Sequence, residues 1–158
     1  MAKINIGLSD KNRSAIIKIL SAHLADQHVL YVKMRNFHWN VTGPRFNDLH
    51  RFLEEIYTTQ ATVIDDTAER IRALGGAAPG SMKEFLALTR LSETAGKEVH
   101  AETVIKALVN DHETIIRALR TDIEKVDDKL GDAGTADFLT SIMEGVEKTA
   151  WMLRAFLG

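Results

Sequence analysis

The chain has 158 residues, of which 45% are hydrophobic, and this is the size and composition of one globular domain with a substantial core. Its formal net charge of −2 excludes a global attraction to nucleic acid or anionic membranes, and the absence of cysteine excludes disulfides and thiolate metal sites. Because no signal-peptide pattern opens the sequence and no apolar run reaches the ~18 residues of a membrane span, we expect a cytoplasmic, soluble domain over residues 1–158, with a short N-terminal tail at residues 1–8.

A first long helix is predicted from about Ser9 to about His38. Ser9 is a typical N-cap residue, and apolar residues recur after it at helical spacing. The segment NVTGPRF, residues 40–46, contains Gly43 and Pro44 and is therefore predicted to be a turn.

A second helix is predicted over residues 46–74, because Gly75 and Gly76 follow as a C-terminal stop signal. The link after it is long and carries an apolar pattern of its own over residues 82–88, which predicts a short extra helix. Third and fourth helices are predicted at about residues 100–130 and 135–157. Two short turns and one long crossover between the second and third helices predict an all-α fold, a ferritin-like four-helix bundle.

Four candidate metal ligands share one face of the second predicted helix. With His50 at zero on a helical wheel, Glu54 lies at about 40°, Asp65 at about 60° and Glu69 at about 100°. The apolar residues of the same helix lie at about 220–320°, nearly opposite. The ligand face therefore points away from the core of the chain's own bundle.

The four ligands cannot share one ion within a straight helix. The His50/Glu54 and Asp65/Glu69 pairs have midpoints ~22 Å apart at the rise of a helix, whereas metal–ligand bonds are about 2 Å. A second copy laid antiparallel across this face brings each pair against the other pair of its two-fold mate. His38 lies at the short turn and joins the set, so each site takes His38, His50 and Glu54 from one subunit and Asp65 and Glu69 from its mate. The small residues Thr58, Ala61 and Thr62 lie near the proposed axis.

Four segments of the sequence resemble the Dps family, the miniferritins also called DNA-binding proteins from starved cells. They are FHWNVTGPRFNDLH, IDDTAERIRALGG, SMKEFLALTR and the ending WMLRAFLG, and they span nearly the whole chain in order. The resemblance implies a homo-dodecamer of 23 symmetry built on two-fold dimers. It also implies a ferroxidase that oxidises Fe(II) with hydrogen peroxide or dioxygen at inter-subunit sites, stores ferric mineral in the cavity and protects DNA from oxidative damage.

The ligand positions of that family carry over directly to His38, His50, Asp65 and Glu69, whereas Glu54 stands where many members have Asp. Imidazole and carboxylate ligands suit iron, and zinc or manganese would also bind such a set. Trp39, close to the site in sequence, either relays electrons and quenches radicals or packs beside the turn.

Other acidic residues have two interpretations each. Asp127, Asp128, Asp132 and Asp137 form either a solvated turn or, as the resemblance implies for Asp132 and Asp137, part of a three-fold iron-entry pore. Glu55 either helps to nucleate mineral or is a plain surface acid. The other histidines form no second ligand cluster and are interpreted as surface or packing residues: His23, His28, His100 and His112.

An alternative function is that of a nonspecific, nucleoid-associated DNA-binding protein with secondary iron chemistry. Lys3 is the only basic residue before the first predicted helix, and Lys11 and Arg13 complete a weak patch. Binding through phosphate contacts alone would weaken steeply with salt.

Overall fold

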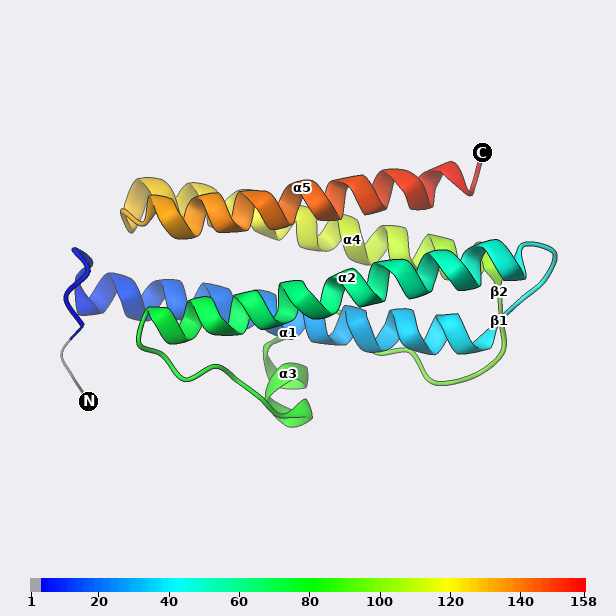
Figure 1. Ribbon diagram of the computed structural model, residues 1–158, viewed down its shortest axis with the longest axis horizontal. Helices are drawn as coiled ribbons and strands as arrows, with labels where there is room; N and C mark the ends of the chain where they lie inside the picture. Colours follow the sequence, from blue (N-terminus) through cyan, green and yellow to red (C-terminus); the bar gives the residue numbers. More distant parts are fainter. Residues whose placement is uncertain (1–3) are drawn as a thin grey trace.

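The computed structural model describes residues 4–158, and it is an all-helical bundle with one short crossover helix (Figure 1). Among these residues, no helix is both long and apolar enough to span a membrane. The long helices are α1 (Asp10–Asn40), α2 (Phe46–Ala73), α4 (Ala101–Glu124) and α5 (Ala133–Ala155), and a π-helical turn (Lys125–Lys129) extends α4. The short helix α3 (Met82–Leu88) lies in the crossover between α2 and α4. Two strands of two residues each, β1 (Val41–Thr42) and β2 (Val99–His100), pair in parallel.

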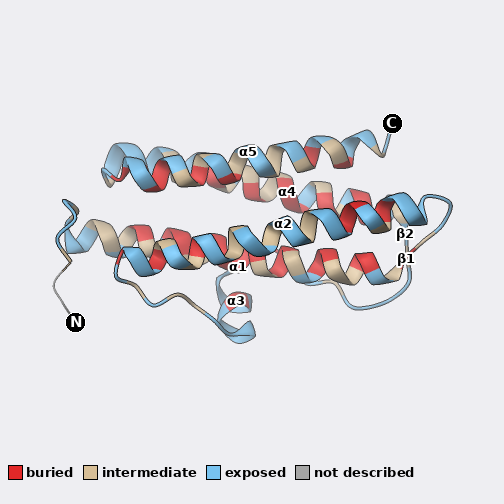
Figure 2. Ribbon diagram, in the orientation of Figure 1, coloured by how far each residue is buried: buried red, intermediate tan, exposed pale blue. Residues whose placement is uncertain are grey.

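The bundle consists of two antiparallel helix pairs. Helix α1 packs along α2, and α4 packs along α5 (Figure 1). The buried residues of all four helices face one another between the pairs, and the outer face of α2 is exposed along most of its length (Figure 2). Large fully buried side chains from each pair make up this core, among them Ile16, Leu20, Leu49, Leu53, Ile105 and Leu108.

The ends of the helices follow local sequence signals. The Ser9 side chain accepts a hydrogen bond of 3.1 Å from the backbone of Asn12, which confirms it as the N-cap of α1. At the end of α2, Gly75 adopts a φ of +89° and the N–H of Gly76 donates to the carbonyl of Ile71 at 3.0 Å, as glycine C-caps do. The predicted boundaries of all five helices are within a few residues of those observed, although the last residues of the third predicted helix form the π-helical turn.

Buried charged groups hold the crossover against the bundle through hydrogen bonds and ion pairs. The carboxylate of Asp26 is fully buried and accepts hydrogen bonds from the Thr89 hydroxyl at 2.9 Å, the Arg90 backbone at 2.6 Å and the Arg90 Nε at 2.7 Å. Arg90 also donates to His23 at 3.1 Å, and His23 bonds Asp122 at 2.8 Å. Burial raises the pKa of Asp122, but the hydrogen bond from His23 and the charge of Arg90 outweigh it and hold this pKa below its usual value.

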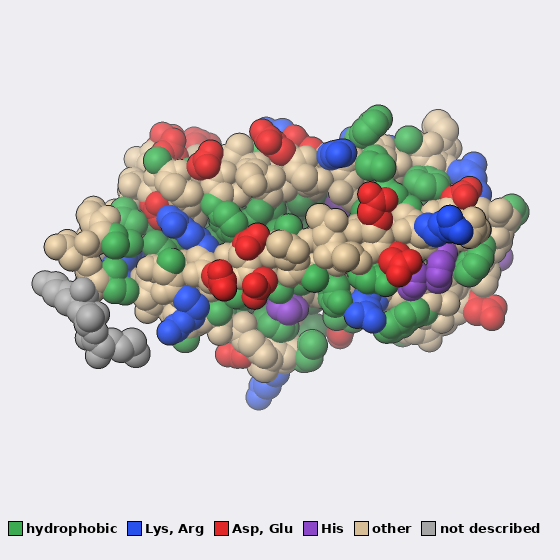
Figure 3. All heavy atoms as spheres, viewed as in Figure 1, with side chains coloured by type: hydrophobic (Ala, Val, Ile, Leu, Met, Phe, Trp, Pro, Cys, Tyr) green, Lys and Arg blue, Asp and Glu red, His purple; other side chains and the backbone are tan. Residues whose placement is uncertain are grey.

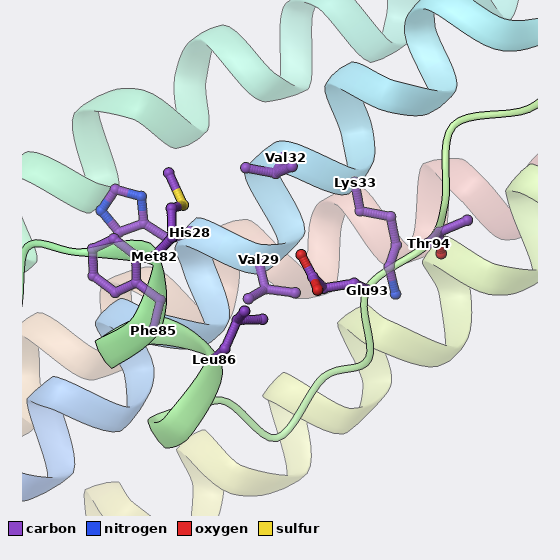
Figure 4. A pocket seen from close by; sticks show the side chains of 9 residues that line it. All are labelled: His28, Val29, Val32, Lys33, Met82, Phe85, Leu86, Glu93 and Thr94. Atoms are coloured by element: carbon purple, nitrogen blue, oxygen red, sulfur yellow. The ribbon is translucent and has the colours of Figure 1, made fainter.

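Helix α3 rests on α1 through an aromatic contact. The rings of His28 and Phe85 stack with centroids 3.9 Å apart, so of the two interpretations of His28, surface or packing, the contact favours packing. A small pocket beside this contact is lined by Val29 and Val32 of α1 and by Met82 and Leu86 of α3 (Figure 4). The crossover is thus held against the outside of the α1–α2 pair.

Candidate metal centre

Two histidines form the structural centre of the predicted site. His38 lies in the last turn of α1 and His50 in the second turn of α2, and their rings stack with centroids 3.7 Å apart. Each Nδ1 lies 2.8 Å from the backbone carbonyl of the other histidine. A carbonyl oxygen only accepts hydrogen bonds, so both Nδ1 atoms carry a proton, and in the neutral tautomer each Nε2 has its lone pair available. This is the protonation pattern that a metal-ligating histidine requires.

Neighbouring aromatic rings fix the orientation of this pair. Tyr57 contacts His38 edge-on at 5.3 Å between centroids, and Phe46 lies 5.0 Å from His50 on the other side. His38 is buried with only 7% of its surface exposed, whereas His50 is partly open to solvent. The open side of the pair therefore lies toward the outer face of α2.

The three predicted carboxylates lie on that same outer face. Glu54, Asp65 and Glu69 are all exposed, as the helical wheel predicted, while Leu53 and Ile71 of the same helix are fully buried. Figure 3 shows acidic side chains spread along α2 and histidine side chains gathered near the α1–α2 turn.

The chain alone does not bring all five candidate ligands together. Helix α2 is continuous from Phe46 to Ala73, so the ~22 Å separation of the two ligand pairs follows from its rise per residue. Within residues 4–158, no group of three or more His, Asp or Glu side chains lies close enough to hold a metal ion. The structure thus joins His38 to His50 and leaves Asp65 and Glu69 at a distance.

An arginine–aromatic cluster beside the histidines was missed by the sequence reasoning. The guanidinium carbon of Arg35 lies 5.2 Å from the ring centroids of both Trp39 and Tyr57 and 5.6 Å from that of Tyr31. Trp39 is 63% exposed and contacts Arg35. The spacing of Tyr31, Arg35 and Trp39 at every fourth residue of α1 was the signal that would have revealed the cluster.

The predicted pore residues differ in their surroundings. Asp132 is buried, and its carboxylate caps α5 by accepting from the Thr135 backbone at 3.0 Å and pairs with Arg70 at 3.1 Å. Its structural role is therefore that of an N-cap, which sequence reasoning did not assign to it. Asp137 and Glu55 are exposed.

Comparisons with known proteins agree with this architecture. The sequence model of the ferritin-like domain matches residues 17–158. DNA protection during starvation protein 2 of Bacillus anthracis is 43% identical over 142 residues, which cover 90% of this chain and 96% of the relative. The crystal structure of a Dps protein from Bacillus brevis is similar, with a TM-score of 0.89 and 36% identity over 96% of this chain and 100% of that one.

A Dps protein from Vibrio cholerae has a TM-score of 0.92 and 30% identity, covering 100% of this chain and 98% of its own, and it is described as a member of the ferritin-like diiron-carboxylate proteins. Both the fold and the sequence therefore point to one group of ferritin-like proteins. The chain belongs to the Dps family.

Proposed function

We propose that this protein is a ferroxidase and iron-storage protein. Fe(II) is its substrate, and two Fe(II) ions together reduce one hydrogen peroxide to two waters, taking up two protons. The observation that carries the proposal is the His38/His50 pair, whose reciprocal hydrogen bonds orient two Nε2 lone pairs at the edge of an exposed acidic helix face. Removing Fe(II) and peroxide together in this way would protect DNA, in keeping with the names of the relatives.

The proposed sites lie between two-fold-related subunits. His38, His50 and Glu54 of one chain meet Asp65 and Glu69 of its mate, twice per dimer, and six such dimers make the proposed dodecamer. The exposed position of all three carboxylates supports this arrangement, because a ligand face that pointed into the bundle would not be available to a partner. Glu54 is one methylene longer than the aspartate that many members of the family have, which would either shift the second iron or loosen one site.

The stoichiometry of oxidation tests the proposed reaction. The protein is loaded anaerobically with Fe(II) and titrated with hydrogen peroxide while ferric absorbance is recorded. The expected end point is one peroxide per two Fe(II) with no hydroxyl radical trapped. An end point of one peroxide per Fe(II) would show that the paired reaction does not occur. Zinc or manganese added first would compete for the same ligands.

Trp39 is proposed as a radical-quenching residue at this site. Its exposed ring and its contact with Arg35, next to Tyr57 and His38, support a path by which an electron reaches the metal pocket.

The two pore candidates give different expected results. Replacing Asp132→Ala removes a helix cap and an ion pair, so we expect the free energy of unfolding to fall by about 1–2 kcal/mol. Asp137→Asn leaves that free energy unchanged, but it slows ferric mineral formation at limiting Fe(II) if three copies of Asp137 line a pore. Denaturant titration and stopped-flow uptake measure the two effects. Normal uptake in Asp137→Asn would remove this residue from the pore.

DNA binding receives less support as the principal function. Lys3 lies outside the described residues. Arg13 is held by Asp10 at 2.6 Å and by the Leu74 carbonyl at 2.8 Å, so of the two patch residues that the structure describes, only Lys11 is an exposed cation without an ion pair. We expect a gel shift of linear DNA only at low salt, lost at about 0.15 M. Retardation that persists at that salt would favour the nucleoid-binding alternative.

A further inference from the structure

A groove runs between α2 and α5, and its lining also includes Met34 of α1 and His112 of α4. It has a volume of about 390 Å³, within the range of small-molecule sites. Its walls include Phe52 and Ile56 of α2 and Phe138 and Val146 of α5. Figure 3 shows hydrophobic side chains exposed in the furrow between these two helices. The groove therefore offers an apolar surface of the size of a small organic molecule.

One buried polar atom opens into this groove. His112 of α4 is 97% buried, and its Nδ1 donates to the carbonyl of Leu108 at 2.7 Å, which leaves Nε2 as an acceptor. Nε2 forms no hydrogen bond within residues 4–158. It is also not one of the completely enclosed side-chain atoms without a partner in this part of the chain, so some of its surface is accessible. Because His112 lines the groove, we take the groove to be the side from which this lone pair is reached.

Burial keeps this imidazole neutral. Burial lowers the pKa of His112 to about 4, although the bond to the Leu108 carbonyl opposes the shift. At neutral pH His112 is thus an uncharged acceptor, and it is the one polar residue among the buried lining residues Met34, Phe52, Ile142 and His112. The lining also includes exposed polar residues: Glu55, Thr59, Asp66, Ser141 and Lys148. A buried lining that is apolar apart from one acceptor favours an uncharged ligand with one donor.

The groove lies on a different face of α2 from the proposed metal site. On the wheel that places His50 at zero, Glu55, Thr59 and Asp66 fall at about 140–180°, whereas the proposed ligands fall at about 0–100°. A two-fold mate laid across the ligand face would leave the groove accessible. The groove is therefore independent of the proposed iron site.

We propose that this groove is a binding site for small, uncharged hydroxyaromatic molecules of the phenol class. The ring lies between Phe52 and Phe138, and the hydroxyl donates to Nε2 of His112. Flat aromatic rings gain from contact with phenylalanine edges and with the methionine sulfurs that also line the groove, Met34 and Met152.

The test compares phenol with toluene, which has the same ring and a methyl group in place of the hydroxyl. Titration calorimetry on the assembled protein is expected to show that phenol binds about tenfold more tightly than toluene. This ratio corresponds to the free energy of one hydrogen bond, which phenol makes to His112 and toluene cannot make. A crystal soaked in phenol is expected to place the phenol oxygen within hydrogen-bond distance of His112 Nε2. Equal affinities, or a groove that holds only water in that crystal, would overturn the proposal.

Two substitutions separate the acceptor from the shape of the groove. His112→Phe keeps a flat ring but removes the acceptor, so phenol loses its tenfold advantage and toluene binds as before. His112→Gln places an amide oxygen near the position of Nε2 and retains part of that advantage. An unchanged phenol preference in His112→Phe would also overturn the proposal. If that variant does not assemble, the soaked wild-type crystal and the wild-type affinity ratio decide.

Discussion

Co-assembly of two inactive variants is expected to restore about a quarter of the oxidation sites, if each site takes ligands from two subunits. His50→Ala destroys one half of every proposed site, and Asp65→Ala destroys the other half. In a mixed dimer, one site then carries both substitutions and the other carries neither. Random pairing makes half of all dimers mixed, and each mixed dimer holds one intact site.

Each variant alone is expected to oxidise Fe(II) about a hundredfold more slowly than the wild type or worse, because loss of even a supporting group around a metal commonly costs 10–100-fold. The measurement is the rate of ferric absorbance after peroxide addition to the variants alone, mixed as folded shells, and refolded together. Only refolding together should restore activity. A co-refolded sample as inactive as its components, or a double variant with the wild-type rate, would show that the inter-subunit assignment is wrong.

Acid is expected to remove about 3 kcal/mol of folding free energy through His112 alone. The pKa of this histidine falls from 6.5 to about 4 in the folded protein because burial disfavours the charged imidazolium. The unfolded chain therefore binds the proton first as the pH falls. The contribution is fully present above pH ~6.5 and is lost progressively down to the folded pKa.

The comparison that isolates this effect uses His112→Phe, measured by denaturant unfolding between pH 7 and pH 4.5. The free energy of unfolding of the wild type should fall more steeply with acid than that of the variant. His100→Gln is the matched control, because His100 is exposed and caps α4 without a side-chain hydrogen bond. The control should retain the slope of the wild type. Parallel slopes for wild type and His112→Phe would mean that His112 is not buried as a neutral group.

The helices were predictable because their signals are local. The Ser9 side chain accepts from the backbone of Asn12, three residues on, and Gly75 ends α2 through its own backbone conformation, so neither needs information from elsewhere in the chain. The separation of the ligand pairs was equally predictable, since the period and rise of a helix place Glu54 and Asp65 without tertiary knowledge.

Features that depend on residues far apart in sequence were not predictable in this way. Asp132 was interpreted as part of either a solvated turn or a pore, and its pairing with Arg70 was not foreseen, because Arg70 is 62 positions away and nothing local indicates that pair. His112 was placed only as a surface or packing residue, because its complete burial depends on how α4 meets the other helices. The reciprocal bonds of His38 and His50 likewise required the exact fit of α1 against α2, which the turn sequence does not specify.

The two stacked imidazoles both donate to backbone carbonyls, and this makes each histidine replaceable without the other. Each ring is held by the main chain of the other residue, and a main-chain carbonyl survives any change of side chain. Substituting His38 leaves the anchor of His50 in place, and the reverse holds equally. Descendants of this sequence can therefore alter one of the two proposed ligands at a time without first losing the backbone anchor of the other.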